Sequence, residues 1–235
     1  MRTMKREAIL LVNSWRLHDT GEHAGVIAAE DCIHSERHFR PLRRRQFLAG
    51  RSLLRHQLQQ TTGIPGEAWR IVTDEGGRPR AVGPDGQPGP DLSVSHSGEW
   101  VVSALVTQGR IGIDIELTRR DRPATAMAEV ALSADEQVAV SIGGEPAFLR
   151  FWTLREAIGK AEGGGLDAAL EIEGAILLGV AGAPAAVTLG GAPWILAQRM
   201  FEGGALAVAW RIGDAAVAEA PSRLADALDA GLGPP

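Results

Sequence analysis

Two acidic residues in the segment RIGIDIEL, Asp114 and Glu116, are the clearest candidates for chemistry in this sequence. They alternate with Ile111, Ile113 and Ile115, and successive side chains of a β-strand point to opposite faces. The isoleucines are therefore expected on a buried face and both carboxylates on the other. Two adjacent carboxylates repel each other unless a cation compensates them, and oxygen ligands suit Mg²⁺. A solvent-facing acidic strand end is the alternative interpretation.

A third carboxylate lies in FWTLREAIGKAEGGGL, residues 151–166. On a helix, Trp152, Glu156 and Lys160 share one side because each follows the last by four positions. Glu156 can then complete a metal site, and Lys160 suits the charge of a phosphate. The simpler alternative is a surface ion pair between Glu156 and Lys160, worth roughly a few tenths of a kcal/mol.

Ser95 and His96 form a third motif in LSVSHSGEWVVSAL, residues 92–105. Residues adjacent in sequence rarely have the geometry of a nucleophile and its base, and no orienting acid is indicated. As hydrogen-bond donors to a phosphate or nucleotide they need no third residue.

The basic segment RHFRPLRRRQFLAGRSLLR, residues 37–55, carries an apolar stripe at helical spacing that includes Phe47 and Leu54. A solvated helix face is one interpretation. Because the chain has a net charge of -5, so concentrated a positive patch favours an anionic small ligand. The negative net charge argues against a nucleic-acid partner.

Periodicity and turn residues predict the elements that position these groups. Strands are expected at 8–13, 69–73, 100–107, 111–117, 174–180, 185–189, 194–200 and 205–211. Helices are expected at 41–60 and 145–162, with a short one starting at the capping box Ser133–Glu136 and an amphipathic one in the tail 222–235. The glycine- and proline-rich residues 74–91 predict a loop. Each half then holds one principal helix and several strands, an α+β arrangement.

Other features limit the class of protein. The single cysteine, Cys32, excludes an internal disulfide framework and suits a reducing cytoplasm. The first apolar stretch is too short for a signal peptide. The uncharged run 174–198 is interrupted by prolines and glycines, so we expect no membrane span. A cytoplasmic protein without a membrane partner is expected.

The order of SHSG, GIDIE and WTLREAxxKxxGxGL resembles the 4′-phosphopantetheinyl transferases in their larger, surfactin-type single-chain form, over roughly residues 36–166. The resemblance implies a monomer of two similar α+β halves, 1–111 and 112–235, about a pseudo-twofold axis, with the active site in the cleft between them. It implies transfer of the phosphopantetheine arm of coenzyme A to a serine of an apo acyl or peptidyl carrier protein, releasing adenosine 3′,5′-bisphosphate.

The same resemblance implies residue roles. Mg²⁺ is expected on Asp114, Glu116 and Glu156, with Glu156 or a metal-bound water taking the proton of the acceptor serine. Lys160 is expected at the pyrophosphate of coenzyme A. The other expected coenzyme A contacts are Ser95, His96, Arg78 and Arg155, with Arg40, Arg44 and Arg45 as competing choices for the 3′-phosphate. Arg155 stands where the family usually has lysine, so it can pair with phosphate but cannot move a proton.

Two other functions fit the same residues. One is a Mg²⁺-dependent phosphohydrolase of a nucleotide diphosphate, with water as nucleophile. The other is a non-catalytic module that binds coenzyme A or a carrier protein. The carrier served, whether in fatty acid, polyketide or nonribosomal peptide synthesis, stays open.

Overall fold

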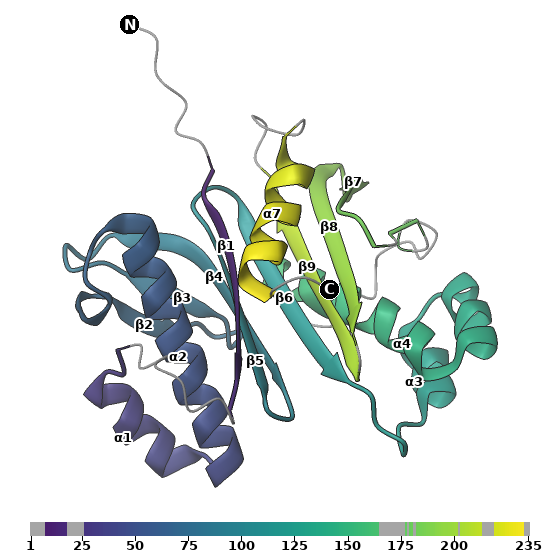
Figure 1. The fold of residues 1–235 in the computed structure, drawn as a ribbon, viewed down its shortest axis with the longest axis horizontal. Helices are drawn as coiled ribbons and strands as arrows, with labels where there is room; N and C mark the ends of the chain where they lie inside the picture. The colour runs from purple at the N-terminus through teal and green to yellow at the C-terminus, as the bar shows by residue number, and fades with distance from the viewer. Residues whose placement is uncertain are drawn as a thin grey trace, which may run out of the picture.

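The computed structural model describes residues 8–17, 26–164, 177, 179–180, 182–201, 203–212 and 219–232. The described residues form two antiparallel sheets (Figure 1). The larger sheet has the order β1-β5-β4-β3-β2, with β1 Leu10–Arg16, β2 Arg70–Thr73, β3 Pro79–Val82, β4 Pro88–Ser97 and β5 Trp100–Val106. The smaller sheet has the order β6-β9-β8-β7, with β6 Arg110–Leu117, β7 Ala185–Leu189, β8 Ala192–Phe201 and β9 Gly204–Arg211. The expected α+β class is confirmed.

Each sheet carries one long helix on one face. The described helices are α1 Ala29–His38, α2 Pro41–Thr62, α3 Ala124–Ala131, α4 Ala134–Glu162 and α7 Ala220–Leu232, with a 3-10 turn at Gly66–Ala68. Leu54 and Leu58 of α2 pack on Leu92 and Leu105 of the larger sheet. The helix α4 packs on the smaller sheet through a core that includes Phe148, Leu154, Leu196 and Ala207.

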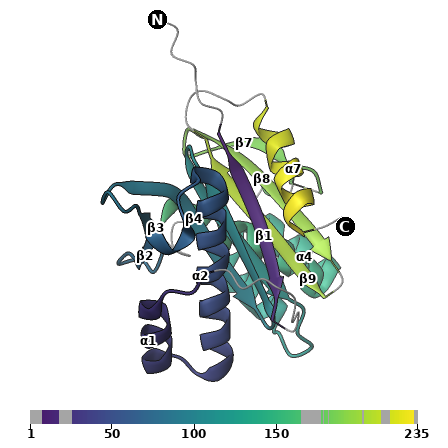
Figure 2. The ribbon, with the colours of Figure 1, turned by 60° about the vertical axis from the view of Figure 1, so that its left-hand side comes forward.

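A further core joins the two sheets. Val12 of β1, Ile113 of β6 and Val208 of β9 belong to one buried cluster with Leu224 of α7. The helix α7 lies along β1 in both ribbon views (Figures 1 and 2), where Ser14 Oγ donates to the carbonyl of Gly231 at 3.2 Å. The beginning and the end of the described chain therefore pack together. The pseudo-twofold relation of the halves stays a prediction.

The two sheets meet where β6, the edge strand of the smaller sheet, lies beside β4. Three backbone N–H groups of β6 donate to side chains of β4: Ile111 to Asp91 at 2.7 Å, Ile113 to Ser93 at 3.1 Å and Leu117 to Ser97 at 3.1 Å. Side-chain oxygens thus occupy an edge that another strand would otherwise pair with. The sheets divide between β5 and β6, so the expected boundary at 111 and 112 falls two residues inside β6.

Most expected elements match the structure, with four differences. The loop expected at 74–91 is wrong in part, because β3 and the first residues of β4 lie within it. The helices α1 and α3 were not expected. The helix expected at 145–162 is continuous with the short one before it, apart from a kink at Gly144, where φ is 63°. The strand expected at 174–180 lies largely outside the described residues, and 177, 179 and 180 are not in a strand.

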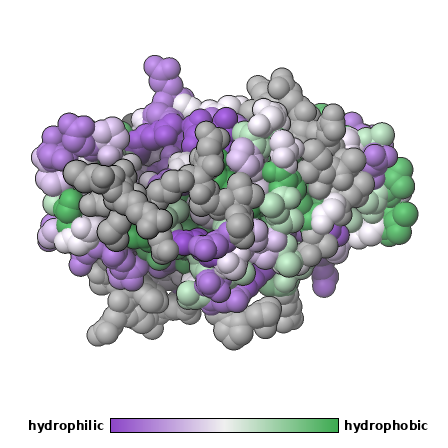
Figure 3. Space-filling view, turned by 90° about the horizontal axis from the view of Figure 1, so that it is seen from above, coloured by the Kyte–Doolittle hydropathy of each residue, from purple (hydrophilic) through white to green (hydrophobic). Residues whose placement is uncertain are grey.

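Hydrophobic residues gather on the surface at the end of the molecule that carries α3 and α4 (Figure 3). The exposed large hydrophobic side chains of these helices are Val130, Val138 and Ile142. Among the described residues, no helix combines the length and the apolar character needed to cross a bilayer.

Candidate active site

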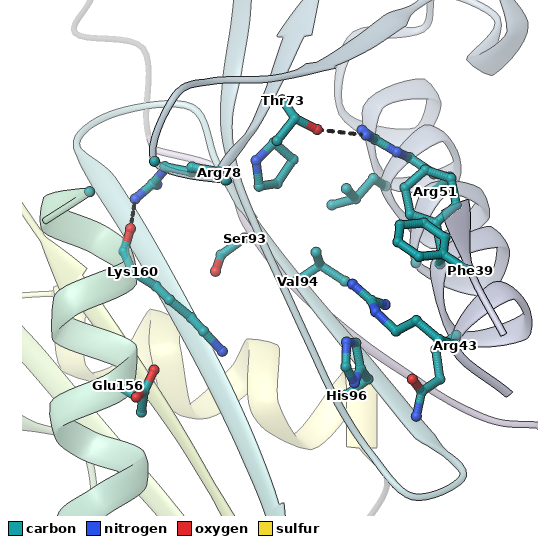
Figure 4. Close-up of a pocket in the computed structure, with 18 of the residues that line it drawn as sticks. Phe39, Arg43, Arg51, Thr73, Arg78, Ser93, Val94, His96, Glu156 and Lys160 are labelled. Carbon is teal, nitrogen blue, oxygen red and sulfur yellow. Dashed lines mark hydrogen bonds between the residues drawn. The ribbon is translucent and has the colours of Figure 1, made fainter. Parts of the chain in front are cut away.

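A cavity of about 500 Å³ opens between α2, β4 and α4 (Figure 4). Its lining comes from both sides of the expected domain boundary. In the close-up, Phe39, Arg43 and Arg51 form one wall, and Glu156 and Lys160 form the opposite wall. His96 and Val94 of β4 lie between them. Of the residues expected at the site, Arg78, His96, Glu156 and Lys160 line this cavity.

The first wall is basic and aromatic. Arg43 lies over the ring of Phe39, 5.1 Å from its centre, and Arg51 lies over Phe47 at 4.9 Å. His34 contacts both phenylalanine rings. Arg43 is exposed, and a guanidinium stacked on an aromatic face keeps its charge, which suits an anionic ligand. Arg51 is 8% exposed and also bonds Thr73 at 3.0 Å and Asp31 at 3.5 Å.

The expected 3′-phosphate contacts, Arg40, Arg44 and Arg45, do not line the cavity. Arg40 is the exposed residue before α2, Arg44 pairs with Glu36 at 2.6 Å, and Arg45 donates to the carbonyl of Leu17 at 2.7 Å. The arginines of α2 that do line the cavity are Arg43 and Arg51. They stand four residues before and after Phe47, so on a helix they share its side. The position of this apolar residue could therefore have identified them from the sequence.

The opposite wall is carried by the second part of α4, a helix with well-defined ends. The Ser133 side chain and Glu136 form the expected capping box, and Gly163 ends the helix with a left-handed φ of 82°. Gly112 of β6 lies so close to α4 that an added Cβ would stand 1.8 Å from the carbonyl oxygen of Ala157. Only glycine allows this approach, which brings the helix face with Glu156 and Lys160 against β6.

Lys160 and Asp114 form the centre of a buried polar cluster. The ammonium of Lys160 donates to Asp114 Oδ1 at 2.6 Å and to Ser95 Oγ at 2.9 Å, and Ser95 Oγ donates to the same carboxylate at 2.7 Å. Asp114 is 4% exposed. Ser95 and Asp114 do not line the cavity, but both bind Lys160, which does. Ser95 therefore orients the lysine and the carboxylate.

Glu116 points to the same side of β6 as Asp114, as the strand alternation predicts, while Ile111, Ile113 and Ile115 enter the shared core. Glu116 accepts a hydrogen bond from Arg122 at 2.8 Å. Arg122 also pairs with Glu145 at 2.8 Å, next to the kink of α4.

The carboxylates influence one another electrostatically. Burial raises the pKa of Glu116, and Asp114 raises it further, while Arg122 lowers it. Burial also raises the pKa of Glu156, where Lys160 lowers it and Asp114 and Glu116 raise it. Burial is the main cause of both shifts, and the neighbouring carboxylates act in the same direction.

His96 has a different environment on β4, facing α2. Burial, followed by the positive charges of Arg43 and Lys160, lowers the pKa of His96 to about 4. The imidazole is therefore neutral at physiological pH and can both donate and accept a hydrogen bond.

Arg155 does not reach the cavity, so the expectation of a phosphate contact from it is revised. Its side chain is 1% exposed and pairs with the fully buried Glu136 at 2.7 Å. Neighbouring residues of a helix point about 100° apart, so Arg155 faces the first part of α4 while Glu156 faces the cavity. Its charge joins the two parts of the kinked helix.

Arg78 lines the cavity, yet its guanidinium contacts protein groups. It pairs with Asp91 and donates to the carbonyls of Lys160, Ala161 and Ile111. The expected contact with the nucleotide stays a prediction, and in this structure the guanidinium bridges β4, β6 and the end of α4.

The donor set of the three carboxylates suits Mg²⁺, a hard cation that prefers oxygen. Asp114 Oδ2 is buried and lacks a hydrogen-bond partner within the described residues, which is uncommon for a carboxylate. In the described ranges, no three histidine, cysteine, aspartate or glutamate side chains stand close enough to hold a metal ion as they lie. The residues fit a cation in chemistry, and Lys160 and Arg122 supply the nearby positive charge in this arrangement.

Part of the chain is similar to proteins of known function. Residues 110–216 match the family model described as the 4′-phosphopantetheinyl transferase superfamily. The chain is 29% identical over 155 residues to the 4′-phosphopantetheinyl transferase HetI of Nostoc sp., covering 64% of this chain and 65% of the relative. It is 33% identical over 132 residues to the 4′-phosphopantetheinyl transferase psf-1 of Bacillus pumilus, covering 52% of each chain.

A third relative is the 4′-phosphopantetheinyl transferase AcpT of Escherichia coli (strain K12), 32% identical over 130 residues, covering 52% of this chain and 60% of the relative. The chain thus spans less than two thirds of the length of these relatives. The matched region contains both carboxylates of β6 and the helix that bears Glu156 and Lys160. Residues 110–216 of this chain are therefore similar to the 4′-phosphopantetheinyl transferase superfamily.

Proposed function

We propose that this protein transfers the 4′-phosphopantetheine arm of coenzyme A to a serine of an apo acyl or peptidyl carrier protein. The observation that carries the proposal is the placement of Glu156 and Lys160 across one cavity from Arg43 and Arg51, in a chain whose residues 110–216 match the superfamily. A cavity with cations on two sides suits a ligand with phosphates at both ends of a nucleotide, as in coenzyme A.

The reaction forms a bond between the serine oxygen and the phosphorus that bears the pantetheine arm. It breaks the bond from that phosphorus to the bridging oxygen, and adenosine 3′,5′-bisphosphate leaves with the electron pair. The ammonium of Lys160 faces the cavity and stabilises charge on the phosphate oxygens. Glu156, whose pKa is raised by burial, is placed to hold the proton that the serine loses.

Asp114, Glu116 and Glu156 would hold Mg²⁺, and Ser95 and Arg122 orient the first two of these carboxylates. When bound, the ion neutralises negative charge on the diphosphate. His96, neutral beside Arg43, is placed to hydrogen-bond a phosphate without adding charge. The absence of a nucleic-acid or membrane partner, a monomeric state and a cytoplasmic location belong to the same proposal.

Mass spectrometry of the carrier tests the proposal. The protein is incubated with coenzyme A, Mg²⁺ and several apo carrier proteins, and each carrier is expected to gain one phosphopantetheine group. Chelation of the metal and the Lys160→Met variant are expected to abolish the gain. Carriers that all stay unmodified would overturn the proposal.

The same experiment separates the two alternatives. Release of 4′-phosphopantetheine without a carrier would indicate the phosphohydrolase. Tight coenzyme A binding in calorimetry that is indifferent to Mg²⁺ and to Asp114→Ala, with no transfer, would indicate a binding module.

A further inference from the structure

Arg78 is the most heavily bonded side chain at the cavity. Nη1 donates to the carbonyls of Lys160 and Ala161, the latter at 2.8 Å, while Nη2 pairs with Asp91 and donates to the carbonyl of Ile111 at 2.7 Å. The residue is 6% exposed. One guanidinium therefore joins β4 of the larger sheet to β6 of the smaller sheet and to the end of α4.

These partners compensate the charge of Arg78 within the protein. Asp91 supplies a carboxylate, and the last carbonyls of α4 form the negative end of the helix dipole. Asp91 is held in turn by the backbone N–H of Ile111 at 2.7 Å. A guanidinium with this set of acceptors has little capacity left for a phosphate or an adenine.

The turn that carries Arg78 also packs on the end of α4. A Cβ added to Gly76 would stand 3.1 Å from the carbonyl oxygen of Gly163, the residue that ends the helix. Lys160 is then held at two points. Its carbonyl binds Arg78, and its ammonium binds Asp114 and Ser95.

We propose that Arg78 is a positioning residue: its bond to the Lys160 carbonyl fixes the end of α4 so that the Lys160 ammonium stays beside Asp114 at the cavity. Its effect on coenzyme A passes through Lys160, and that consequence rests on the proposed function. The placement of Lys160 itself does not depend on any activity.

The placement can be measured directly, because Lys160 and Lys5 are the two lysines of the chain. Acetylation of the folded protein with limiting reagent, followed by mass spectrometry, gives the rate at Lys160 relative to Lys5. Arg78→Met is expected to raise this ratio about fivefold or more. Arg80→Met is the matched control. Arg80 lies on β3 two residues after Arg78 and pairs with Asp74 and Asp91, but its side chain is 41% exposed and its hydrogen bonds within the described residues do not reach α4. An unchanged ratio in a folded Arg78→Met protein overturns the proposal.

General loosening of the fold is separated from local release by a second variant. Arg78→Lys keeps the charge but cannot bond Asp91 and two carbonyls with one planar fork. It is expected to give an intermediate acetylation ratio with a melting temperature close to that of the wild type. A ratio that rises only in step with a fall in melting temperature, across both variants, counts against positioning.

A double-mutant cycle on coenzyme A affinity tests the route of the effect. Arg78→Met is expected to weaken binding about fivefold in the wild-type background and by less than about twofold in a Lys160→Met background, because coupled residues are not additive. An equal loss in both backgrounds would indicate direct contact of Arg78 with the ligand and overturn the proposal. If the wild type binds no coenzyme A, the proposed function fails, and the acetylation ratio alone decides the role of Arg78.

Discussion

The two walls of the cavity are built in different ways. On the α2 wall, Arg43 is exposed and its contact is the face of Phe39. On the α4 wall, the Lys160 ammonium has three oxygen acceptors, and buried Asp114 is among them. Side chains held by many bonds cannot adjust to a ligand, whereas the exposed Arg43 can; Arg51, bonded to Thr73 and Asp31, is the fixed member of the α2 wall. We infer that the α2 wall contributes affinity and the α4 wall contributes the rate of the reaction.

The largest expected effect is on the α4 wall. Glu156→Gln is expected to lower the transfer rate by about a hundredfold or more while coenzyme A still binds, because the variant cannot accept a proton. Transfer kinetics and calorimetry measure the two quantities. Glu162→Gln, on the same helix and paired with Arg211, is the control and is expected to keep the wild-type rate. Full activity in Glu156→Gln would remove this residue from the mechanism.

On the α2 wall a smaller effect is expected, and it falls on the KM for coenzyme A and not on the rate. Arg43→Met is expected to raise the KM for coenzyme A about fivefold to tenfold, through loss of one charged contact, and to leave kcat within about twofold. The loss should shrink at high salt, since the arginine is exposed. Arg44→Met is the neighbouring control, because Arg44 pairs with Glu36 away from the cavity. A fall in kcat equal to the loss in kcat/KM would contradict the division between the walls.

The smallest expected effect is on the pKa of His96, which the charges of both walls, Arg43 and Lys160, influence. Nuclear magnetic resonance titration of the free protein is expected to give His96 a pKa of about 4, and Arg43→Met is expected to raise it because one of its causes is the charge of Arg43. A depressed histidine pKa means that the unfolded chain binds more protons between pH 6.5 and about 4. The contribution to stability is therefore full above pH 6.5 and is lost as the pH falls toward 4. An ordinary pKa for His96 in the folded protein would show that the cavity is open to water at this point.

The sequence predicted the chemistry of the α4 wall better than that of the α2 wall, for a physical reason. The alternation of Asp114 with the isoleucines and the helical spacing of Glu156 and Lys160 are local periodicities, and both hold in the structure. The basic segment offered five arginines within nine residues, 37–45, and charge alone does not select a helix face. Phe47 does select one, because an apolar residue must be covered and its helical neighbours lie on the same side.

The protein partners of Arg78 and Arg155 were not predicted, for another reason. Both have long side chains whose partners are set by tertiary packing: Arg78 bonds carbonyls 82 and 83 residues later in the chain, and Arg155 bonds a glutamate 19 residues earlier across a kink. No local pattern reports such pairs. The capping box at Ser133 did predict where Glu136 lies, but not that its carboxylate also neutralises a buried arginine.

The contacts between β4 and β6 have a consequence for how this protein can change over evolutionary time. A joint made by continuous strand pairing changes only when its whole register shifts, whereas here Asp91, Ser93 and Ser97 each satisfy one backbone group of the facing strand. The spacing of the two sheets, and with it the width of the cavity above the joint, can therefore be altered by one substitution at a time. Ser93 and Ser97 are therefore the adjustable positions for a bulkier or slimmer substrate, whereas Asp91 is also bound to Arg78.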